Sequence, residues 1–394
     1  MEPPMSALPL PGALRPLSLA YFVQAVGALS VVGCLQAISC EWQLSDSQSA
    51  YLLSVFGITF ALAAPLLQML LGHWARRTQV LAGLLLFSLA ALLLASAPDY
   101  ATLLASRILM GVGAGFIGPV LGALGAGLVS REQQGSAIAT VLLGLSLASL
   151  VGLPLSAWVA TTLGVRPLFA GIGGLGLLTA WLILRQVPDQ VPGERVAPAQ
   201  VARLLTTAHS LHAFLVVFFI AAGVFSTYAF LTPIVREDFH GDVADVSLAL
   251  AVLGIAGVLG NVLVIRAARR LSAERLLLGG LLLLTLALLI LAVGQGRFAA
   301  LLPGLAFWAL ATDILWPSQQ RRILEQLAEA RGIALALTAS FMFCGIGVGT
   351  FVAGQIYPLH GFRGLLLTSL GFLLLALFSL QRSKRTATAP PLPA

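Results

Sequence analysis

The chain has 394 residues, of which 59% are hydrophobic and only 9% are charged, and its mean hydropathy is +0.97. A soluble domain carries roughly 25% charged residues because its surface faces water, so this composition excludes a soluble protein and indicates a lipid surrounding. The net charge of +7 does not indicate nucleic-acid binding, because the basic residues lie in short segments between apolar runs.

Twelve apolar runs of helical length follow one another along the chain. Each is long enough to cross about 30 Å of hydrocarbon, which takes roughly 20 helical residues. The runs lie near residues 17–40, 48–72, 78–97, 101–129, 134–162, 166–185, 210–234, 246–265, 275–294, 298–320, 332–356 and 362–380. The sequence therefore predicts an all-α membrane protein with twelve transmembrane helices.

The basic residues set the expected orientation. If both termini are cytoplasmic, the outer loops keep only Arg166, Arg236, Arg297 and Arg363, as the positive-inside rule requires. We therefore expect a multi-pass protein of the cell (inner or plasma) membrane with cytoplasmic termini. Its expected parts are an N-terminal segment (1–16), a six-helix bundle (17–185), a linker rich in proline and charge (186–209), a second six-helix bundle (210–380) and a tail (381–394).

The two halves of the chain repeat one another. Gly164-Val165-Arg166 recurs half a chain length later as Gly361-Phe362-Arg363. The same offset relates Gly152 to Gly349, and Phe56-Gly57-Ile58 to Leu253-Gly254-Ile255. Two parallel repeats joined by a cytoplasmic linker are typical of transporters that enclose a substrate site near the bilayer midplane.

Two charged residues lie well inside predicted spans, away from their ends. An ionised side chain at mid-helix costs at least about 2.5–3.5 kcal/mol in lipid and is a functional candidate by default. We expect Arg107 to line a central cavity and Asp313, the only carboxylate well inside a span, to carry a coupling proton. The alternatives are a buried structural ion for Arg107 and local hydrogen bonding near the helix end for Asp313.

Short motifs accompany these residues. Residues 107–113 read R-x-x-x-G-x-G, Gly144 precedes Gly152-Leu153-Pro154, and residues 227–233 read T-Y-x-x-x-x-P. At these positions the chain resembles the major facilitator superfamily, specifically its bacterial twelve-helix drug, sugar and nucleoside efflux branch. The resemblance implies two six-helix bundles that rock about a cavity lined chiefly by helices 1, 4, 7 and 10, with export driven by inward proton flow.

The candidate residues fall into two groups. Candidates for the substrate and proton pathway are Gln24, Arg107, Tyr228, Asn261 and Asp313. Candidates for a conformational gate are Gly72, Arg76, Arg77, Gly144, Gly152, Pro154, Arg269 and Arg270. The glycines also suit close helix packing, and the arginine pairs also suit a role in topology. Arg76 stands where the resemblance implies an Asp that holds the outward-facing state, so that latch lacks its acidic member.

Other functions fit the sequence less well. Neither H-E-x-x-H nor G-x-S-x-G occurs, and Cys34, Cys40 and Cys344 have no metal-ligand spacing, so we expect no enzyme, metal or cofactor. The expected partners are a small-molecule substrate, protons and the lipid bilayer, and the expected state is a monomer. Uptake by a symporter or uniporter of the same fold remains an alternative, as does a transport-dead sensor or scaffold.

Overall fold

The computed structural model describes residues 11–130, 133–189, 191–193, 195–268, 270–327 and 331–387. These residues form helices and no strand. The α-helices are α1 (Pro11–Trp42), α2 (Asp46–Leu71), α3 (Arg76–Ala95), α4 (Tyr100–Gly127), α5 (Gln134–Leu147), α6 (Leu153–Thr162), α7 (Val165–Gln186), α8 (Pro198–Thr206), α9 (Ala208–Tyr228), α10 (Leu231–Pro233), α11 (Val243–Ala267), α12 (Ala273–Val293), α13 (Phe298–Gln326) and α14 (Arg331–Ala387). Two π-helical turns, η2 (Ala148–Gly152) and η3 (Ile234–Asp238), interrupt them.

Eleven helices in the described part of the chain are long and apolar enough to cross a membrane. The last, α14, has 57 residues and turns at Gly361, where φ is 56°. It therefore contains both of the spans predicted near 332–356 and 362–380. Each of the other ten helices overlaps one predicted span, which confirms the all-α membrane fold.

Prolines lie at irregular turns within two of the predicted spans. Pro154 lies just after the π-helical turn η2, so the run predicted near 134–162 is divided into α5, η2 and α6. The run predicted near 210–234 is likewise discontinuous, because α9 ends at Tyr228. Pro233 has no N–H to donate to the carbonyl four residues earlier, and its ring crowds that carbonyl, so the helix cannot continue unbroken.

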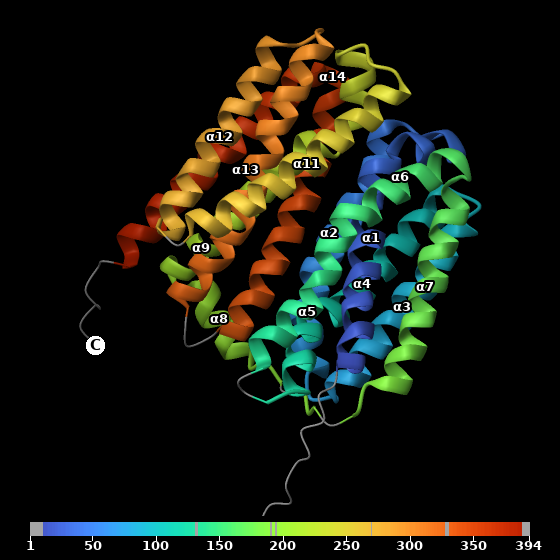
Figure 1. Ribbon diagram of the computed structural model, residues 1–394, viewed down its shortest axis with the longest axis vertical. Helices are drawn as coiled ribbons and strands as arrows, with labels where there is room; N and C mark the ends of the chain where they lie inside the picture. The colour runs from blue at the N-terminus through green and yellow to red at the C-terminus, as the bar shows by residue number, and fades with distance from the viewer. Residues whose placement is uncertain are drawn as a thin grey trace, which may run out of the picture. The chain divides into compact units, whose positions relative to one another are not determined.

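The first of two compact units comprises Met1–Ala37 and Leu62–Val196. Within it, α3 packs against both α4 and α7 (Figure 1). The approach of α3 to α4 is close because both contribute glycine: a Cβ on Gly83 would lie 2.7 Å from the carbonyl oxygen of Gly113. Small residues bring membrane helices together in this way.

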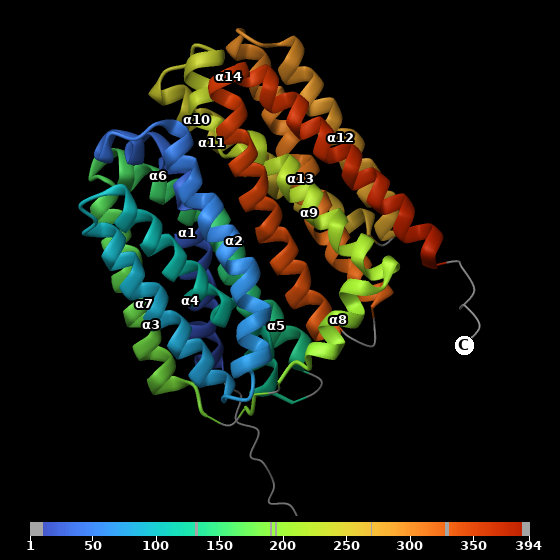
Figure 2. The same cartoon turned by 180° about the vertical axis from the view of Figure 1, so that it is seen from behind.

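The second unit comprises Ile38–Ala61 and Ala197–Ala394. Here α9 runs along α14, while α11 and α12 both pack on α13 (Figure 2). The first part of α2 belongs to this unit because it contacts α14: a Cβ on Gly57 would lie 2.5 Å from the Phe343 carbonyl oxygen, and the Ser47 hydroxyl donates to Gly354 O at 2.6 Å. This division differs from the bundle predicted at 17–185, whose boundaries stay a prediction.

The sequence repeat has a structural counterpart. Gly164 and Gly361 both have positive φ, 105° and 56°, and each stands where a new membrane helix begins. Glycine adopts such angles without the steric cost that other residues incur. Gly152 packs against the side chain of Val26 on α1, whereas Gly349 packs against the backbone of Ala222 on α9.

The segments outside the predicted bundles are partly helical. Residues 198–206 of the predicted linker form α8, and α14 continues into the predicted tail as far as Ala387. At the other end, α1 begins at Pro11, within the predicted N-terminal segment. Residues 1–10 and 388–394 lie outside the described residues.

Candidate functional site

Arg107 of α4 is fully buried in the first unit. Its guanidinium donates to two backbone carbonyls of α1, Gly27 O at 2.7 Å and Ala28 O at 2.9 Å. Helical carbonyls can accept a second hydrogen bond because each has two lone pairs. Arg107 therefore ties α4 to α1, and its place in a substrate pathway stays a proposal.

Gln24 lies on α1 of the same unit, one turn before Gly27. Its side chain is 4% exposed, and its Oε1 atom has no hydrogen-bond partner among the described residues. A buried acceptor without a partner is uncommon in proteins and calls for an explanation. Gln24 thus offers an unused acceptor in the helix that also binds Arg107.

Asp313 lies in the middle of α13, in the second unit, and is partly buried. It lies against α11, where a Cβ on Gly257 would be 2.7 Å from its Oδ2 atom and a Cβ on Gly260 would be 3.1 Å from its own Cβ. The two glycines therefore provide the space that this carboxylate occupies. No hydrogen bond or ion pair joins it to another residue in the described part of the chain.

Tyr228, at the end of α9, stacks on Trp308 of α13. The ring centroids are 5.2 Å apart and the ring planes differ by 28°. Both rings line a small pocket together with Thr227 and apolar side chains that include Leu231, Ile234 and Leu305. Asp313 and this aromatic pair thus combine a free carboxylate with an apolar surface in a single unit.

Asn261 is exposed on α11, immediately after Gly260. Of the five predicted pathway residues, Gln24 and Arg107 lie in the first unit, whereas Tyr228, Asn261 and Asp313 lie in the second. Tyr228 stacks on Trp308 of α13, the helix that also carries Asp313.

Three of the predicted gate residues lie where α2 gives way to α3: Gly72 is in the connecting loop, and Arg76 and Arg77 are the first two residues of α3. The carbonyl of Gly72 accepts from Gln79 Nε2 at 3.1 Å. Arg76 donates to Ala123 O of α4 at 2.9 Å, and Arg77 donates to Leu184 O of α7 at 2.5 Å. All three residues therefore make contacts inside the first unit.

The remaining gate candidates lie on α5, η2 and α6 and in the segment that follows α11. Gly144 on α5 packs directly on the α1 backbone at Ser18, and Gly152, at the end of η2, also packs on α1. Pro154 follows at the start of α6. Arg270 is exposed after α11, whereas Arg269 lies outside the described residues.

The family model of the Major Facilitator Superfamily matches residues 17–233 and again residues 213–393. The chain belongs to this superfamily. It is therefore a multi-pass membrane transport protein for a small molecule, and not an enzyme.

Relatives of this facilitator include the inner membrane transport protein YdhP of Escherichia coli (strain K12), which is 28% identical over 87% of this chain and 88% of its own length. The chloramphenicol efflux pump of Mycobacterium tuberculosis is 25% identical over 96% of this chain and 94% of its own. The fold is also similar to the crystal structure of a bacterial homolog of the human lysosomal transporter Spinster in an inward-facing, occupied conformation. There the TM-score is 0.71 at 16% identity, over 96% of this chain and 98% of the other.

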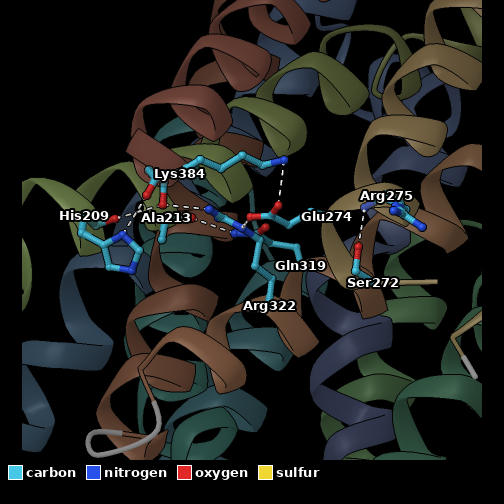
Figure 3. Close-up of polar contacts among 9 residues, drawn as sticks. His209, Ala213, Ser272, Glu274, Arg275, Gln319, Arg322 and Lys384 are labelled. Atoms are coloured by element: carbon cyan, nitrogen blue, oxygen red, sulfur yellow. Dashed lines mark hydrogen bonds and ion pairs between the residues drawn. The ribbon is translucent and has the colours of Figure 1, made fainter. Parts of the chain in front are cut away.

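Sequence reasoning missed a polar cluster around Arg322 of α13 (Figure 3). Arg322 is 1% exposed, its Nε atom lies 3.6 Å from Glu274 Oε1, and its Nη2 atom donates to Ser383 Oγ at 2.8 Å. Glu274 also pairs with Lys384 at 2.7 Å, and His209 contacts Ser383 O at 2.8 Å. The cluster joins α9, α12, α13 and α14. Its members are far apart in sequence, so no sequence motif indicates it.

A second missed cluster surrounds Tyr357 of α14. Its hydroxyl lies 3.2 Å from Glu237 Oε2 and 3.0 Å from Asp238 Oδ2, although a phenol has one proton and can donate to only one of them at a time. Burial raises the pKa of the Asp238 carboxyl above its ordinary value. The neighbouring acids of the sequence were a visible signal, but only the fold places Tyr357 between them.

Proposed function

We propose that this transporter exports a small molecule in exchange for protons, with Asp313 as the residue that carries the proton. The observation that supports the proposal is the state of Asp313. It is the one described carboxylate that lies well inside a span, and no described residue gives it a hydrogen bond or an ion pair. A carboxylate inside a span that has no counter-charge beside it suits a group that alternates between proton and substrate.

Exchange follows if proton and substrate compete for this carboxylate. When it is ionised, Asp313 attracts a cationic group, while the stacked rings of Tyr228 and Trp308 offer an apolar surface to the rest of the substrate. When it is protonated, the carrier without substrate no longer holds an uncompensated charge and can reorient. The two forms thus bias the same conformational equilibrium in opposite directions.

The relatives support export over uptake. The mycobacterial relative is named as an efflux pump, and the alignment with it covers almost all of both chains. We further propose a monomer with cytoplasmic termini and with Gln24, Arg107 and Asn261 along the pathway, whose two bundles alternate in access. The glycines and arginines named above as gate candidates would serve that movement.

The experiment begins with a thermal-shift screen of the purified protein against sugars, nucleosides and lipophilic cations. Transport of the ligand found is then measured in oriented vesicles with an imposed pH gradient. Asp313→Asn resembles the protonated form and should abolish uphill transport while exchange of substrate across the membrane persists. Glu325→Gln, an exposed acid on the same helix, is the matched control and should transport normally.

Two outcomes would contradict this proposal. Uphill transport by Asp313→Asn at the wild-type rate would show that coupling lies elsewhere, with the acids beside Tyr357 as the next candidates. If the transport rate of the unaltered protein does not depend on the pH gradient, the protein is a uniporter.

A further inference from the structure

Several of the described residues between α7 and α8 are hydrogen-bonded to the rest of the first unit. The backbone N–H of Arg76 donates to Val191 O at 3.1 Å, and the N–H of Val196 donates to Gln68 O at 3.4 Å. Arg195 Nε donates to His73 Nδ1 at 3.1 Å. Three contacts within six residues therefore attach this segment to the end of α2, to the loop that follows it and to the first residue of α3. We call the residues Val191–Gly193, Arg195 and Val196 the strap.

Apolar packing and a glycine complete the attachment. Val191 is only 8% exposed, and its side chain fills the space that Gly127 leaves at the end of α4, 2.7 Å from where a Cβ would stand. Gly193 lies so close to the carbonyls of Gly72 and Trp74 that a Cβ there would overlap both oxygens. These two atoms are backbone and cannot swing aside, so only glycine fits at position 193 in this arrangement.

A buried side-chain network fixes the surface that receives the strap. Gln79 is 1% exposed and donates to Gly72 O at 3.1 Å and to Trp74 O at 2.8 Å, the two carbonyls that face Gly193. Gln68 in turn donates to Gln79 Oε1 at 3.0 Å. Because satisfied buried networks are rigid, the loop presents a fixed binding surface.

The other end of the connection is also held. The first unit ends at Val196 and the second resumes at Ala197. Pro198 begins α8, and the single residue Thr207 separates α8 from α9. The Ser210 hydroxyl donates to Leu204 O at 2.5 Å and so attaches α8 to α9. Hence only the extended residue Ala197, with ψ of 130°, separates two anchored segments.

We propose that the strap is a fixed part of the first unit and that Ala197 is a short joint between the units. A free segment could extend by up to about 3.5 Å for each residue, so α8 could move without displacing the first unit. The docked strap cannot extend in this way, so displacement of α8 is transmitted to the α2–α3 loop. This loop leads directly into Arg76, which stands in place of the acidic member of the expected latch, and the strap supplies a different restraint there. The inference does not depend on proton coupling.

The first test measures access to Val191 in purified protein whose Cys34, Cys40 and Cys344 have been replaced by serine. Val191→Cys should react with a maleimide much more slowly than Gln186→Cys, an exposed reference at the end of α7. Adding Gly193→Val should speed its labelling by about tenfold, the factor that corresponds to roughly 1.4 kcal/mol of lost docking. Gly171→Val is the control, because nothing lies within 4 Å of its Cβ position.

The second test uses hydrogen–deuterium exchange to ask whether the strap restrains the joint. Releasing the strap with Gly193→Val should speed amide exchange both in residues 72–76 and in the first turn of α8, and Gly171→Val should change neither. Equal labelling of Val191→Cys and Gln186→Cys would show that the strap is not docked, whether or not the Gly193 variant folds. Faster exchange in the strap alone, with α8 unchanged, would overturn its role at the joint. Neither readout requires a substrate, so failure here is separate from failure of the coupling proposal.

Discussion

At the scale of single residues, the most informative contact is that of Asp313 with the glycines of α11. The carboxylate lies where the side chain of any larger residue at position 257 would project. Burial without a partner is costly for a charged group, and the sequence pattern alone does not show which neighbours tolerate it. The structure explains Gly257 and Gly260 as the residues that accommodate the carboxylate.

This contact predicts the effect of Gly257→Ala. The added methyl group would displace the Asp313 carboxylate, and since a misplacement of about 1 Å can cost up to 10²-fold in a positioned reaction, we expect a clear loss of uphill transport. The measurement is the transport rate as a function of pH, whose midpoint should move with the carboxylate.

Gly254→Ala provides the control on the same helix. Nothing lies within 4 Å of its Cβ position, so the variant should transport normally and gain about 0.5–1 kcal/mol of helix stability. Equal transport by the two alanine variants would contradict a positioning role for Gly257.

Arg107 is buried by a cost that the sequence shows, but its hydrogen-bond partners are visible only in the fold. The cost of a charge in lipid favours the protein interior for this side chain, and Arg107 is fully buried, while its place beside a central cavity stays a prediction. The sequence does not show that the α1 carbonyls at Gly27 and Ala28 accept its hydrogen bonds, because those contacts depend on how α1 and α4 pack.

At the scale of elements, the Arg322 cluster holds the ends of four helices together. Arg322 is buried, whereas its partner Glu274 is 34% exposed. We expect Glu274→Gln to lower the stability of the purified protein by about 1–2 kcal/mol, which is less than a fully buried pair would cost because solvent screens Glu274. The thermal unfolding midpoint in detergent provides the measurement.

The comparison for this prediction is Glu325→Gln. It breaks the exposed pair between Arg321 and Glu325, whose side chains are 39% and 51% exposed. An exposed pair of this spacing contributes about 0.3–0.5 kcal/mol, so the midpoint should hardly move. If both variants unfold at the same temperature, the Arg322 cluster is not a stabilising contact.

At the scale of the whole molecule, the distribution of arginine predicts the topology. Reporter fusions at residues 200 and 390 should both be active only in a cytoplasmic format, because the positive-inside rule places the joining segment and the C-terminus on that side. A periplasmic signal from either position would contradict the predicted orientation and an even number of spans.

The sequence by itself determined the class, the spans and the repeat. Lipid demands long apolar helices with internally bonded backbones, so composition and run length suffice to find them. The motifs pointed correctly to the superfamily that the family match shows. The equivalence of Gly164 and Gly361 was also visible, since a positive φ favours glycine in both halves.

Only the tertiary structure decided which partners these residues have. Three features depend on contacts between residues that are far apart in sequence. They are the assignment of α2 to two units, the Arg322 cluster and the docking of the strap on the α2–α3 loop. The composition of segment 186–209 predicts only a linker, because prolines and charges indicate local backbone conformation and not tertiary contacts. Its attachment depends on carbonyls, a glycine and a buried glutamine that folding brings together, and a contact of this kind leaves no periodic signal in the chain.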